Sequence, residues 1–501
     1  MSQIRKLASQ TAVYGLSAMV GRLINYLLVP LYVRTLSVYD NGVMTNVYAY
    51  VTFLIIVFTY GLETGYFRFA NKEGGQEKEV YKTTLTAITG SSVIFAFILI
   101  AAAAPVAQLI GFPDHPEYVV YFAVILCLDA ISSIPFVRLR NQNKPLKFVA
   151  GKLLSIGINI VFVLFFLVLC PYILRHDPGS ILSKIYNPET GVGYVFISNL
   201  IASLFTIFFL YREVISGWGK MDMHLLKKML LYSLPLMFAG LAGTVNESFS
   251  RIILQQELPY SSTENTIQLG IFGNCFKLAI FMSLAIQTFR MASEPFFFSM
   301  YKQVDAKIIY ARVMNYFVIA CCLIFLGVML YLDIIKHILM PVYFEGLIVV
   351  PILLLGYLFL GIYQNLSIWF KLADKTRFGI YFTVFGAILT IVFNYALIPV
   401  YGYTGSAIAT LICYFSMAVA CYIIGQRYYT VPYNLKKIIG YLIFTLTLYA
   451  TGDIIRLFIF NPGTVAWFLS MALLIGIFVL VVLKIEKPNL KISNVRSQDH
   501  Q

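Results

Sequence analysis

Three charged residues lie inside long apolar stretches of the sequence, where a charge is costly. Arg22, Lys277 and Asp129 have no opposite charge three or four positions away, and a charge near the bilayer centre costs about 2.5–3.5 kcal/mol on insertion scales. Asn25 follows Arg22 by about one helical turn, and Asn274 precedes Lys277 by the same spacing. We interpret the two cations and their amides as a site for an anionic ligand, because a guanidinium binds phosphate through two hydrogen bonds and an ammonium acts as a point charge.

The same three residues also allow structural interpretations. Either cation can form an ion pair with Asp129 across helices, and the long side chain of Lys277 can extend toward the membrane surface. Asp129 can equally bind a proton or a cation. The sequence leaves these alternatives open.

Six further charges are spaced so that each can meet an opposite charge on its own helix face. These pairs are Glu247 with Arg251, Arg290 with Glu294, and Asp453 with Arg456. We expect structural ion pairs as their default role.

Some members of these pairs also enter the candidate site. Arg251 and Arg290 are further candidates for contact with an anionic substrate. The candidates for ion coupling or charge pairing are Asp129 and Glu247, inside apolar stretches, and Glu63 and Glu294, which follow the cytoplasmic ends of two of them.

The stretches that carry these charges are long enough to cross a membrane. Of 501 residues, 59% are hydrophobic and 12% are charged, against roughly a quarter charged in soluble domains. Runs of about 20 apolar residues match the hydrocarbon thickness of a bilayer, and residues 160–169 are apolar on every face, unlike a transmembrane strand. We predict an all-α polytopic membrane protein with about fourteen transmembrane helices, at residues 11–32, 42–62, 84–110, 118–137, 153–172, 192–211, 229–250, 269–289, 313–332, 347–370, 379–399, 403–424, 438–455 and 464–483.

The positions of the basic residues predict the orientation of these helices. With both termini in the cytoplasm, 29 of the 37 Lys and Arg residues lie in cytoplasmic segments and six in outer segments, which is the asymmetry of the positive-inside rule. The formal net charge of +14 is therefore mostly a consequence of topology. It gives no support to nucleic acid as a partner.

The two halves of the chain resemble each other at one nearly constant offset, which is slightly less than half of the chain length. The matching positions are Gly42-Val43 with Gly270-Ile271, Glu63 with Glu294, Tyr81-Lys82 with Tyr310 and Arg312, and residues 140–144 with 371–375. An offset of six helices returns the chain to the same side of the membrane, which predicts parallel repeats. We therefore expect a six-helix lobe at 1–212, a second at 213–425, two added helices at 426–484 and a cytoplasmic tail at 485–501.

The sequence contains none of the phosphate-loop, dinucleotide, zinc-protease or nucleophile-elbow motifs, and no soluble segment exceeds about 25 residues. The seven cysteines lie in or beside apolar runs, without the spacing of a disulfide framework or a zinc site. We expect no enzymatic activity, no metal and no cofactor. Uphill transport would then draw on a proton or sodium gradient.

Three segments of the chain resemble the polysaccharide transporters of the MOP exporter superfamily, the Wzx-like O-antigen flippases. They are the opening Thr11-Ala-Val-Tyr-Gly with Arg22-Leu-Ile-Asn-Tyr and residues 30–44, the segment Ser250-Arg-Ile-Ile-Leu with residues 269–273, and residues 394–410. The resemblance covers essentially the whole chain and is most specific at residues 394–410. One position departs from the pattern, because Ser250 stands where an Asp often precedes the arginine of the seventh helix, and the acid here is Glu247.

The resemblance implies a flippase in the bacterial inner membrane that moves undecaprenyl-pyrophosphate-linked oligosaccharide through a cationic cavity, for O-antigen, capsule or exopolysaccharide synthesis. We expect Arg22 and Lys277 to neutralise the pyrophosphate, with Asn25 and Asn274 as hydrogen-bond partners of the substrate. Besides membrane lipids, a polysaccharide polymerase and a chain-length regulator are the expected partners. A lipid II flippase and an ion-coupled multidrug exporter of the same superfamily remain as alternatives, and a membrane-embedded polymerase or ligase is disfavoured by the short outer loops.

Overall fold

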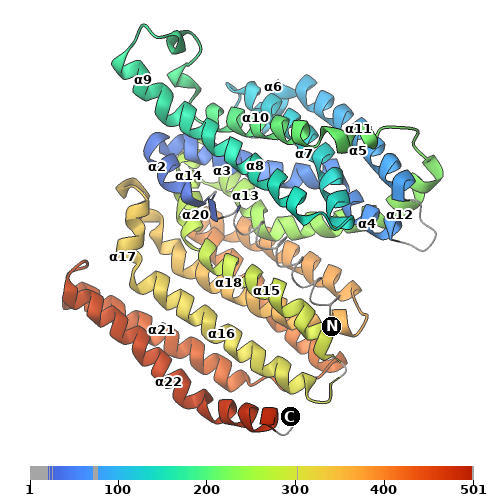
Figure 1. The fold of residues 1–501 in the computed structure, drawn as a ribbon. Coiled ribbons are helices and arrows are strands. Elements are labelled where there is room, and N and C mark those ends of the chain that lie inside the picture. The colour runs from blue at the N-terminus through green and yellow to red at the C-terminus, as the bar shows by residue number, and fades with distance from the viewer. Residues whose placement is uncertain (1–20, 22, 25, 72–76, 302, 499–501) are drawn as a thin grey trace. The chain divides into compact units, whose positions relative to one another are not determined.

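The computed structural model is built from helices (Figure 1), and it describes residues 21, 23–24, 26–71, 77–301 and 303–498, with the side chains of 292 and 487–498 left out. No strand occurs among these residues. Within the described residues, ten helical stretches, several of which join two or more labelled helices, are long and apolar enough to cross a membrane, and the bent pair α14–α15 makes an eleventh if it is one span. The predicted class, an all-α polytopic membrane protein, is confirmed.

The α-helices are α2 (Val29–Thr35), α3 (Val38–Thr59), α4 (Leu62–Ala70), α5 (Glu77–Ala101), α6 (Ala103–Leu109), α7 (Pro116–Asn141), α8 (Pro145–Leu164), α9 (Cys170–His176), α10 (Gly193–Phe209), α11 (Tyr211–Ser216), α12 (Met223–Thr244), α13 (Ser250–Glu257), α14 (Ser262–Leu278), α15 (Ile280–Met300), α16 (Ala306–Leu330), α17 (Leu332–Ile335), α18 (Val349–Leu366), α19 (Ile368–Leu372), α20 (Arg377–Tyr428), α21 (Leu435–Phe458) and α22 (Val465–Gln498). Two π-helical turns, η1 (Phe165–Leu169) and η4 (Val245–Phe249), join α8 to α9 and α12 to α13. The 3₁₀ turns are η2 (Ile181–Lys184), η3 (Pro188–Thr190), η5 (Lys336–Ile338) and η6 (Pro341–Ile348).

The count of fourteen spans stays a prediction. Most of the first expected span lies outside the described residues, and α10, at 17 residues, is a shorter apolar helix than the ten. The 52-residue α20 covers two expected spans and breaks between them at Gly402, whose φ of 56° lies in the left-handed region that favours glycine.

The chain divides into two compact units. Unit 1 contains residues up to Asn274 together with Thr383–Ala409, and unit 2 contains Cys275–Phe382 and Thr410–Gln501. The lobe boundaries expected at 212 and 425 follow the span count and also stay a prediction.

Unit 1 has an aromatic core between α3, α7 and α10. The ring centroids of Tyr48 and Phe122 are 5.5 Å apart, and those of Phe122 and Phe196 are 4.7 Å apart, both edge to face. Asn199 donates a hydrogen bond to the Tyr48 hydroxyl at 3.3 Å. Such pairs each add about 0.5–1.5 kcal/mol beyond the free energy of the area that they bury. They therefore stabilise the packing of α3 against α7 and α10.

Unit 2 is centred on α16 and α18, and α21 and α22 pack beside them. Glu486 of α22 is almost fully buried, and it accepts hydrogen bonds from Lys437 and Tyr441 of α21, both at 2.7 Å. Breaking one partner of a buried charge pair is strongly destabilising. This contact therefore fixes the two C-terminal helices to each other.

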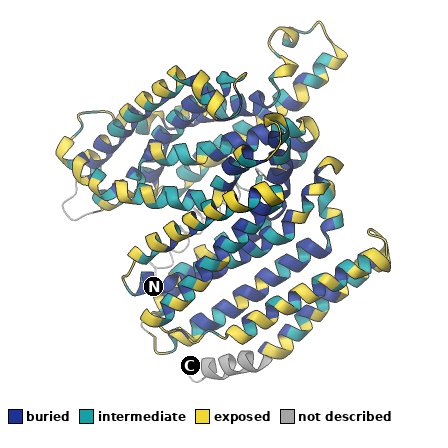
Figure 2. Cartoon of the chain, turned by 180° about the vertical axis from the view of Figure 1, so that it is seen from behind, coloured by how far each residue is buried: buried dark blue, intermediate teal, exposed yellow. Residues whose placement is uncertain are grey.

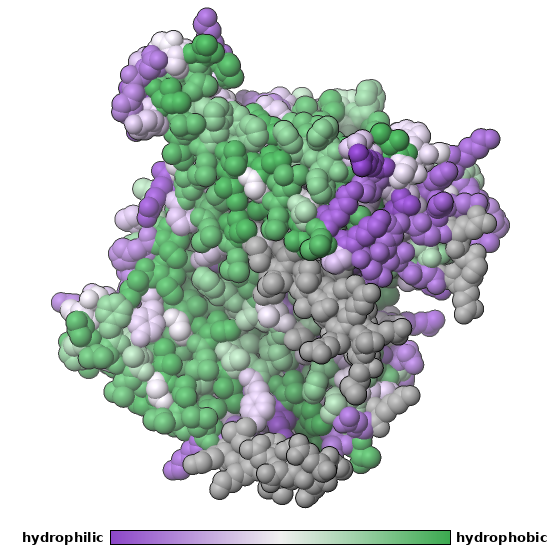
Figure 3. All heavy atoms as spheres, in the orientation of Figure 1, coloured by the Kyte–Doolittle hydropathy of each residue, from purple (hydrophilic) through white to green (hydrophobic). Residues whose placement is uncertain are grey.

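The outward faces of the helices are exposed and apolar. Figure 2 shows exposed residues along these faces and buried residues along the inward faces, and hydrophobic side chains dominate the face drawn in Figure 3. Large side chains such as Phe97, Phe208 and Leu469 are each more than 60% exposed. A soluble protein rarely exposes so much apolar surface, whereas a bilayer covers it.

Two turns show the duplication at the level of the backbone. Asn143, after α7, and Asp374, after α19, both have a φ of 54°. The following N–H groups, of Lys144 and Lys375, donate to the carbonyls of Leu139 and Phe370 at 2.9 and 2.8 Å, which is the Schellman pattern of helix ends. The separation of the two turns along the chain matches the offset found in the sequence.

The same offset relates two buried aromatic pairs. Tyr66 packs edge to face on Tyr81 at 6.1 Å in unit 1, and Phe297 packs edge to face on Tyr310 at 4.9 Å in unit 2. The hydroxyls of Tyr81 and Tyr310 each donate to a backbone carbonyl, of Glu213 and Phe297 respectively. The repeat is therefore structural as well as sequential.

Candidate functional site

Helices α3 and α14 cross backbone to backbone at glycines of unit 1. A Cβ placed on Gly42 would overlap the carbonyl of Thr266, and one placed on Gly270 would overlap the carbonyl of Val38 and lie 3.3 Å from the Cα of Gly42. A Cβ on Gly273 would overlap Thr45. Small residues allow helix backbones this close in membranes, so no larger side chain fits without separating the helices.

This crossing relates equivalent positions of the two repeats. Gly42 and Gly270 are separated along the chain by the same number of residues as Val38 and Thr266, so the members of each pair are equivalent in the two repeats. Gly42 meets Thr266, and Gly270 meets Val38 in the same way. The crossing is therefore a pseudo-symmetric contact between repeats. We call Val38, Gly42, Thr45, Thr266, Gly270 and Gly273 the glycine crossing.

Asn274, an expected substrate contact, lies one turn beyond Gly270. It is fully buried, and its amide donates to the Gly270 carbonyl at 3.0 Å. Nearby, the Gln255 amide donates to the Thr266 hydroxyl at 2.9 Å, and Asn265 donates to the carbonyl of Gln255 at 3.2 Å. In this conformation Asn274 belongs to the closed crossing, so reaching a substrate requires the crossing to open.

Asp129 lies at the convergence of four helices of unit 1. The hydroxyl of Ser203 on α10 donates to its carboxylate at 2.7 Å. Lys152 on α8 interacts electrostatically with Asp129 on α7 and with Glu63 on α4, and its ammonium lies 4.1 Å from the centroid of the Phe136 ring. We call Glu63, Asp129, Lys152 and Ser203 the charge cluster.

Lys152 is not among the residues predicted from the sequence, because the fifth expected span begins at Leu153. In the structure, α8 begins at Pro145, so Lys152 lies two turns inside the helix. Val161 is nine residues on, on the opposite face at 3.6 residues per turn, and is 62% exposed, whereas Val163, on the same face as Lys152, is buried. The spacing of exposed and buried positions along 152–163 is the signal that places Lys152 on the same helix face as Val163, although Lys152 itself is exposed.

The π-helical turn η4 carries Glu247, which is exposed. Its neighbour Asn246 donates to the carbonyl of Thr383 at 3.3 Å and accepts from the Thr390 hydroxyl at 3.4 Å. Asn394, one turn further along α20, is fully buried and donates to the Thr390 carbonyl at 2.7 Å. π-helical turns occur frequently at functional sites, and this one joins α12 to the first half of α20 by polar contacts.

The predicted ion pairs within single helices have different outcomes. Asp453 and Arg456 are paired at 3.0 Å, as expected. The prediction for Arg290 and Glu294 is wrong, because Arg290 is exposed and, among the described ion pairs, Glu294 contacts the ammonium of Lys371 on α19 instead. The neighbouring helix α19 provides Lys371 as the partner of Glu294, and the spacing of residues along one helix does not show such a contact.

The other predicted site residues are only partly placed. Arg22 and Asn25 lie outside the described residues, so their role stays a prediction. Lys277, near the end of α14, and Arg251, on α13, are half-buried. No group of three or more His, Cys, Asp or Glu residues with the geometry of a metal site occurs in the part of the chain that the structure describes.

Comparison with solved structures identifies the fold. The lipid II flippase MurJ, in an inward closed conformation, matches with a TM-score of 0.73 and 12% identity, covering 96% of this chain and 100% of its own. An inward-facing multidrug resistance MATE transporter of the MOP superfamily gives a TM-score of 0.64 at 14% identity, covering 81% of this chain and 94% of its own. The Vibrio cholerae MATE transporter VcmN, in its bent form, gives 0.55 at 14% identity, with 88% and 99% covered. The fold is that of MOP-superfamily transporters and flippases.

No curated protein matches the sequence at a significant level. The profile of a family described as polysaccharide biosynthesis protein matches residues 7–301. This match extends over more than half of the 501 residues, and the chain therefore belongs to the polysaccharide biosynthesis protein family.

Proposed function

We propose that the protein is a flippase that carries undecaprenyl-pyrophosphate-linked oligosaccharide across the inner membrane of a bacterium by alternating access. The observation that carries the proposal is the match to a polysaccharide biosynthesis family in a chain whose fold is that of a lipid-linked-substrate flippase. The lipid tail can remain in the bilayer, while the pyrophosphate and sugars need a polar path because burying them in hydrocarbon is costly.

The glycine crossing supports a closed outer side. The distribution of Lys and Arg places the first residues of α3 and α14 outside, and these are the residues that meet at Gly42 and Gly270. Separating the crossing would open the outer side and expose Asn274. The path for the substrate would then open alternately to the two sides of the membrane as the repeats rock against each other, which is the motion expected of duplicated transporters.

The substrate contacts remain those that the sequence suggested. Arg22 and Lys277 neutralise the pyrophosphate in this proposal, with Arg251 and Arg290 as further cations. Asn25 and Asn274 hydrogen-bond sugar or phosphate oxygens. Each of these contacts is a proposal that rests on residue type and helical position.

The charge cluster supports a proton or sodium gradient as the driving force. Glu63 and Asp129 are two acidic residues beside the one basic residue Lys152, so with all three ionised one added proton or cation would neutralise the cluster. Binding that neutralises a cluster shared by four helices can change their packing. Glu247 and Glu294 are the remaining acidic candidates.

The test is complementation of a strain that lacks its oligosaccharide flippase. We expect the double variant Arg22→Gln/Lys277→Gln to lose surface glycan while it accumulates in the membrane at the normal level. The control is Lys184→Gln, which changes an exposed lysine of η2. Normal glycan export by the double variant would contradict the assigned roles, and failure of the unchanged protein with every oligosaccharide tested would contradict the function.

A lipid II flippase is the second candidate, and the extent of the MurJ match favours it. MurJ covers 96% of this chain, against 81% and 88% for the two MATE transporters. Rescue of a strain depleted of its lipid II flippase would favour this substrate over a surface polysaccharide. A multidrug exporter is less favoured, because cationic drugs call for acidic rather than basic cavity residues.

The proposed setting is the inner membrane, beside a polysaccharide polymerase and a chain-length regulator that use the delivered oligosaccharide. Crosslinking in intact cells tests these partners.

A further inference from the structure

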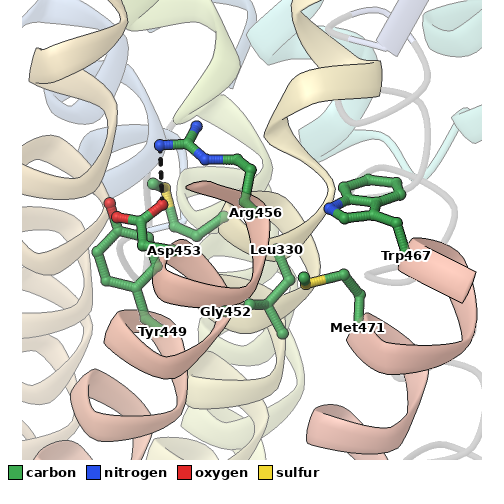
Figure 4. A pocket seen from close by; sticks show the side chains of 8 residues that line it. Leu330, Tyr449, Gly452, Asp453, Arg456, Trp467 and Met471 are labelled. Atoms are coloured by element: carbon green, nitrogen blue, oxygen red, sulfur yellow. Dashed lines mark ion pairs between the residues drawn. The ribbon is translucent and has the colours of Figure 1, made fainter. Parts of the chain in front are cut away.

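A small pocket in unit 2 lies apart from the residues proposed for transport. It is bounded by α16, α21 and α22 (Figure 4), and its polar lining comes from Tyr449, Asp453, Arg456 and Trp467. The remaining space admits one water molecule. Leu330 and Met471 form part of its apolar wall.

Two hydrogen-bond donors of this lining lack an acceptor. The Nε1 of Trp467 and the Nε of Arg456 are both buried and meet no acceptor among the described residues. Trp467 has no exposed surface, and in Figure 4 its indole nitrogen lies on the side of the ring that faces Arg456. Buried N–H groups are almost always hydrogen-bonded in folded proteins, so two that line one pocket point to an acceptor between them.

The charges around the pocket decide which acceptor fits. The terminal nitrogens of Arg456 contact Asp453 at 3.0 Å and Asp333 at 3.5 Å, and Asp333 also contacts Lys336 at 2.6 Å. The positive charges of Arg456 and Lys336 therefore balance the negative charges of the Asp333 and Asp453 carboxylates. An anion would add an uncompensated charge at a half-buried place, whereas a neutral oxygen adds none.

The size of the pocket limits which neutral acceptor can bind there. A sugar ring or a phosphate group is larger than the single water molecule that fits. A water oxygen has two lone pairs, which suits two N–H donors, and its hydrogens can be donated to the carboxylate of Asp453. Buried waters typically make about three such bonds.

We propose that this pocket is a binding site for one water molecule, held by Trp467 Nε1, Arg456 Nε and the Asp453 carboxylate. The water completes a polar joint between the end of α16, the α17–η5 turn and the C-terminal pair α21 and α22. We call Asp333, Lys336, Asp453, Arg456 and Trp467, with this water, the outer joint. Its existence is independent of what the protein transports.

The test uses the indole N–H groups, because the chain has only three tryptophans. The full-length protein is labelled with ¹⁵N at the indoles and placed in nanodiscs of phosphatidylethanolamine and phosphatidylglycerol. Magnetisation transfer from water to each indole proton is then measured. The variant Trp467→Phe identifies the Trp467 signal by its loss. If Trp467→Phe does not fold, the variants Trp218→Phe and Trp369→Phe identify the other two signals, and the remaining one belongs to Trp467.

The other tryptophans provide matched controls. Trp369 is also buried, and its indole N–H likewise meets no acceptor among the described residues, but it does not line this pocket, and we expect no transfer from bound water to it. Trp218 is 60% exposed, so its proton exchanges with bulk solvent. We expect a direct, exchange-independent cross-peak from water to Trp467 alone, and we expect Arg456→Gln to shift the Trp467 signal.

Two results would overturn the proposal. One is a Trp467 indole proton without any contact to water, which means an empty pocket. The other is a cross-peak from Trp467 to lipid headgroup protons, which means that a lipid fills the space.

Discussion

Gly42 of α3 and Gly270 of α14 lie in backbone contact, although they are far apart in the sequence and occupy equivalent positions of the two repeats. A contact between equivalent positions lies close to the pseudo-symmetry axis of a duplicated fold. Because a Cβ at either glycine would overlap the backbone of the other helix, the glycine crossing tolerates no added atom at these two positions.

Replacing Gly270 by Ala tests this contact. We expect Gly270→Ala to reduce glycan export and to lower the free energy of unfolding by about 1–3 kcal/mol, the usual cost of overpacking, because its Cβ would overlap the backbone of Val38. Gly90→Ala is the matched control, since nothing lies within 4 Å of a Cβ at Gly90 and the change favours a helix by about 0.5–1 kcal/mol. Export assays and thermal unfolding of both variants give the comparison, and equal behaviour of the two would argue against the crossing.

The charge cluster predicts that Asp129 and Lys152 act on energy coupling more than on folding. We expect Asp129→Asn to abolish the response of transport to an imposed proton or sodium gradient, because the neutral amide mimics the occupied state. We expect Lys152→Gln to weaken that response about tenfold, the equivalent of about 1.4 kcal/mol.

Reconstituted vesicles with an imposed gradient provide the measurement. The controls are Asp114→Asn and Lys144→Gln, which alter exposed residues next to α7 and α8. Gradient-dependent transport that survives Asp129→Asn would remove Asp129 from the coupling site.

The start of α12 predicts an acid-sensitive contribution to stability. Asp222 caps this helix by accepting the backbone N–H groups of Leu225 at 3.0 Å and His224 at 2.8 Å. The Leu225 bond first, and the His224 bond with it, hold the pKa of the Asp222 carboxyl below its ordinary value. The stabilisation is therefore complete above about pH 4, the unfolded pKa of an Asp, and is lost as pH falls through the lower folded value.

We expect the midpoint of thermal unfolding to fall more steeply below about pH 4 in the unchanged protein than in Asp222→Asn. The amide of Asn also caps helices, but it does not titrate. Parallel pH profiles of the two proteins would show that the cap contributes nothing that depends on its charge.

The helical class and the duplication were predictable because both leave long-range patterns in the sequence. Apolar runs report the membrane, and a constant offset reports the repeat, as the matching turns at Asn143 and Asp374 bear out. The pairing of Asp453 with Arg456 was predictable for a local reason, because the partners are three residues apart.

Contacts between helices were not predictable. Glu294 contacts Lys371, 77 positions away, and nothing in the spacing of Arg290 and Glu294 shows that α19 is the nearer neighbour. Lys152 was missed because hydropathy marks where an apolar run begins, while the helix that contains it begins earlier, at Pro145. Helix packing decides both cases, and a single sequence does not record it.

The seven cysteines have a practical consequence. Six are buried and Cys127 is half-buried, and a thiol reacts only where a reagent can reach its thiolate. A single cysteine introduced at an exposed position, for example in place of Ser183 in η2, will therefore take up a maleimide fluorophore or spin label much faster than the native thiols. Pairs of such labels allow the motion of the repeats to be followed by distance spectroscopy in the otherwise native chain.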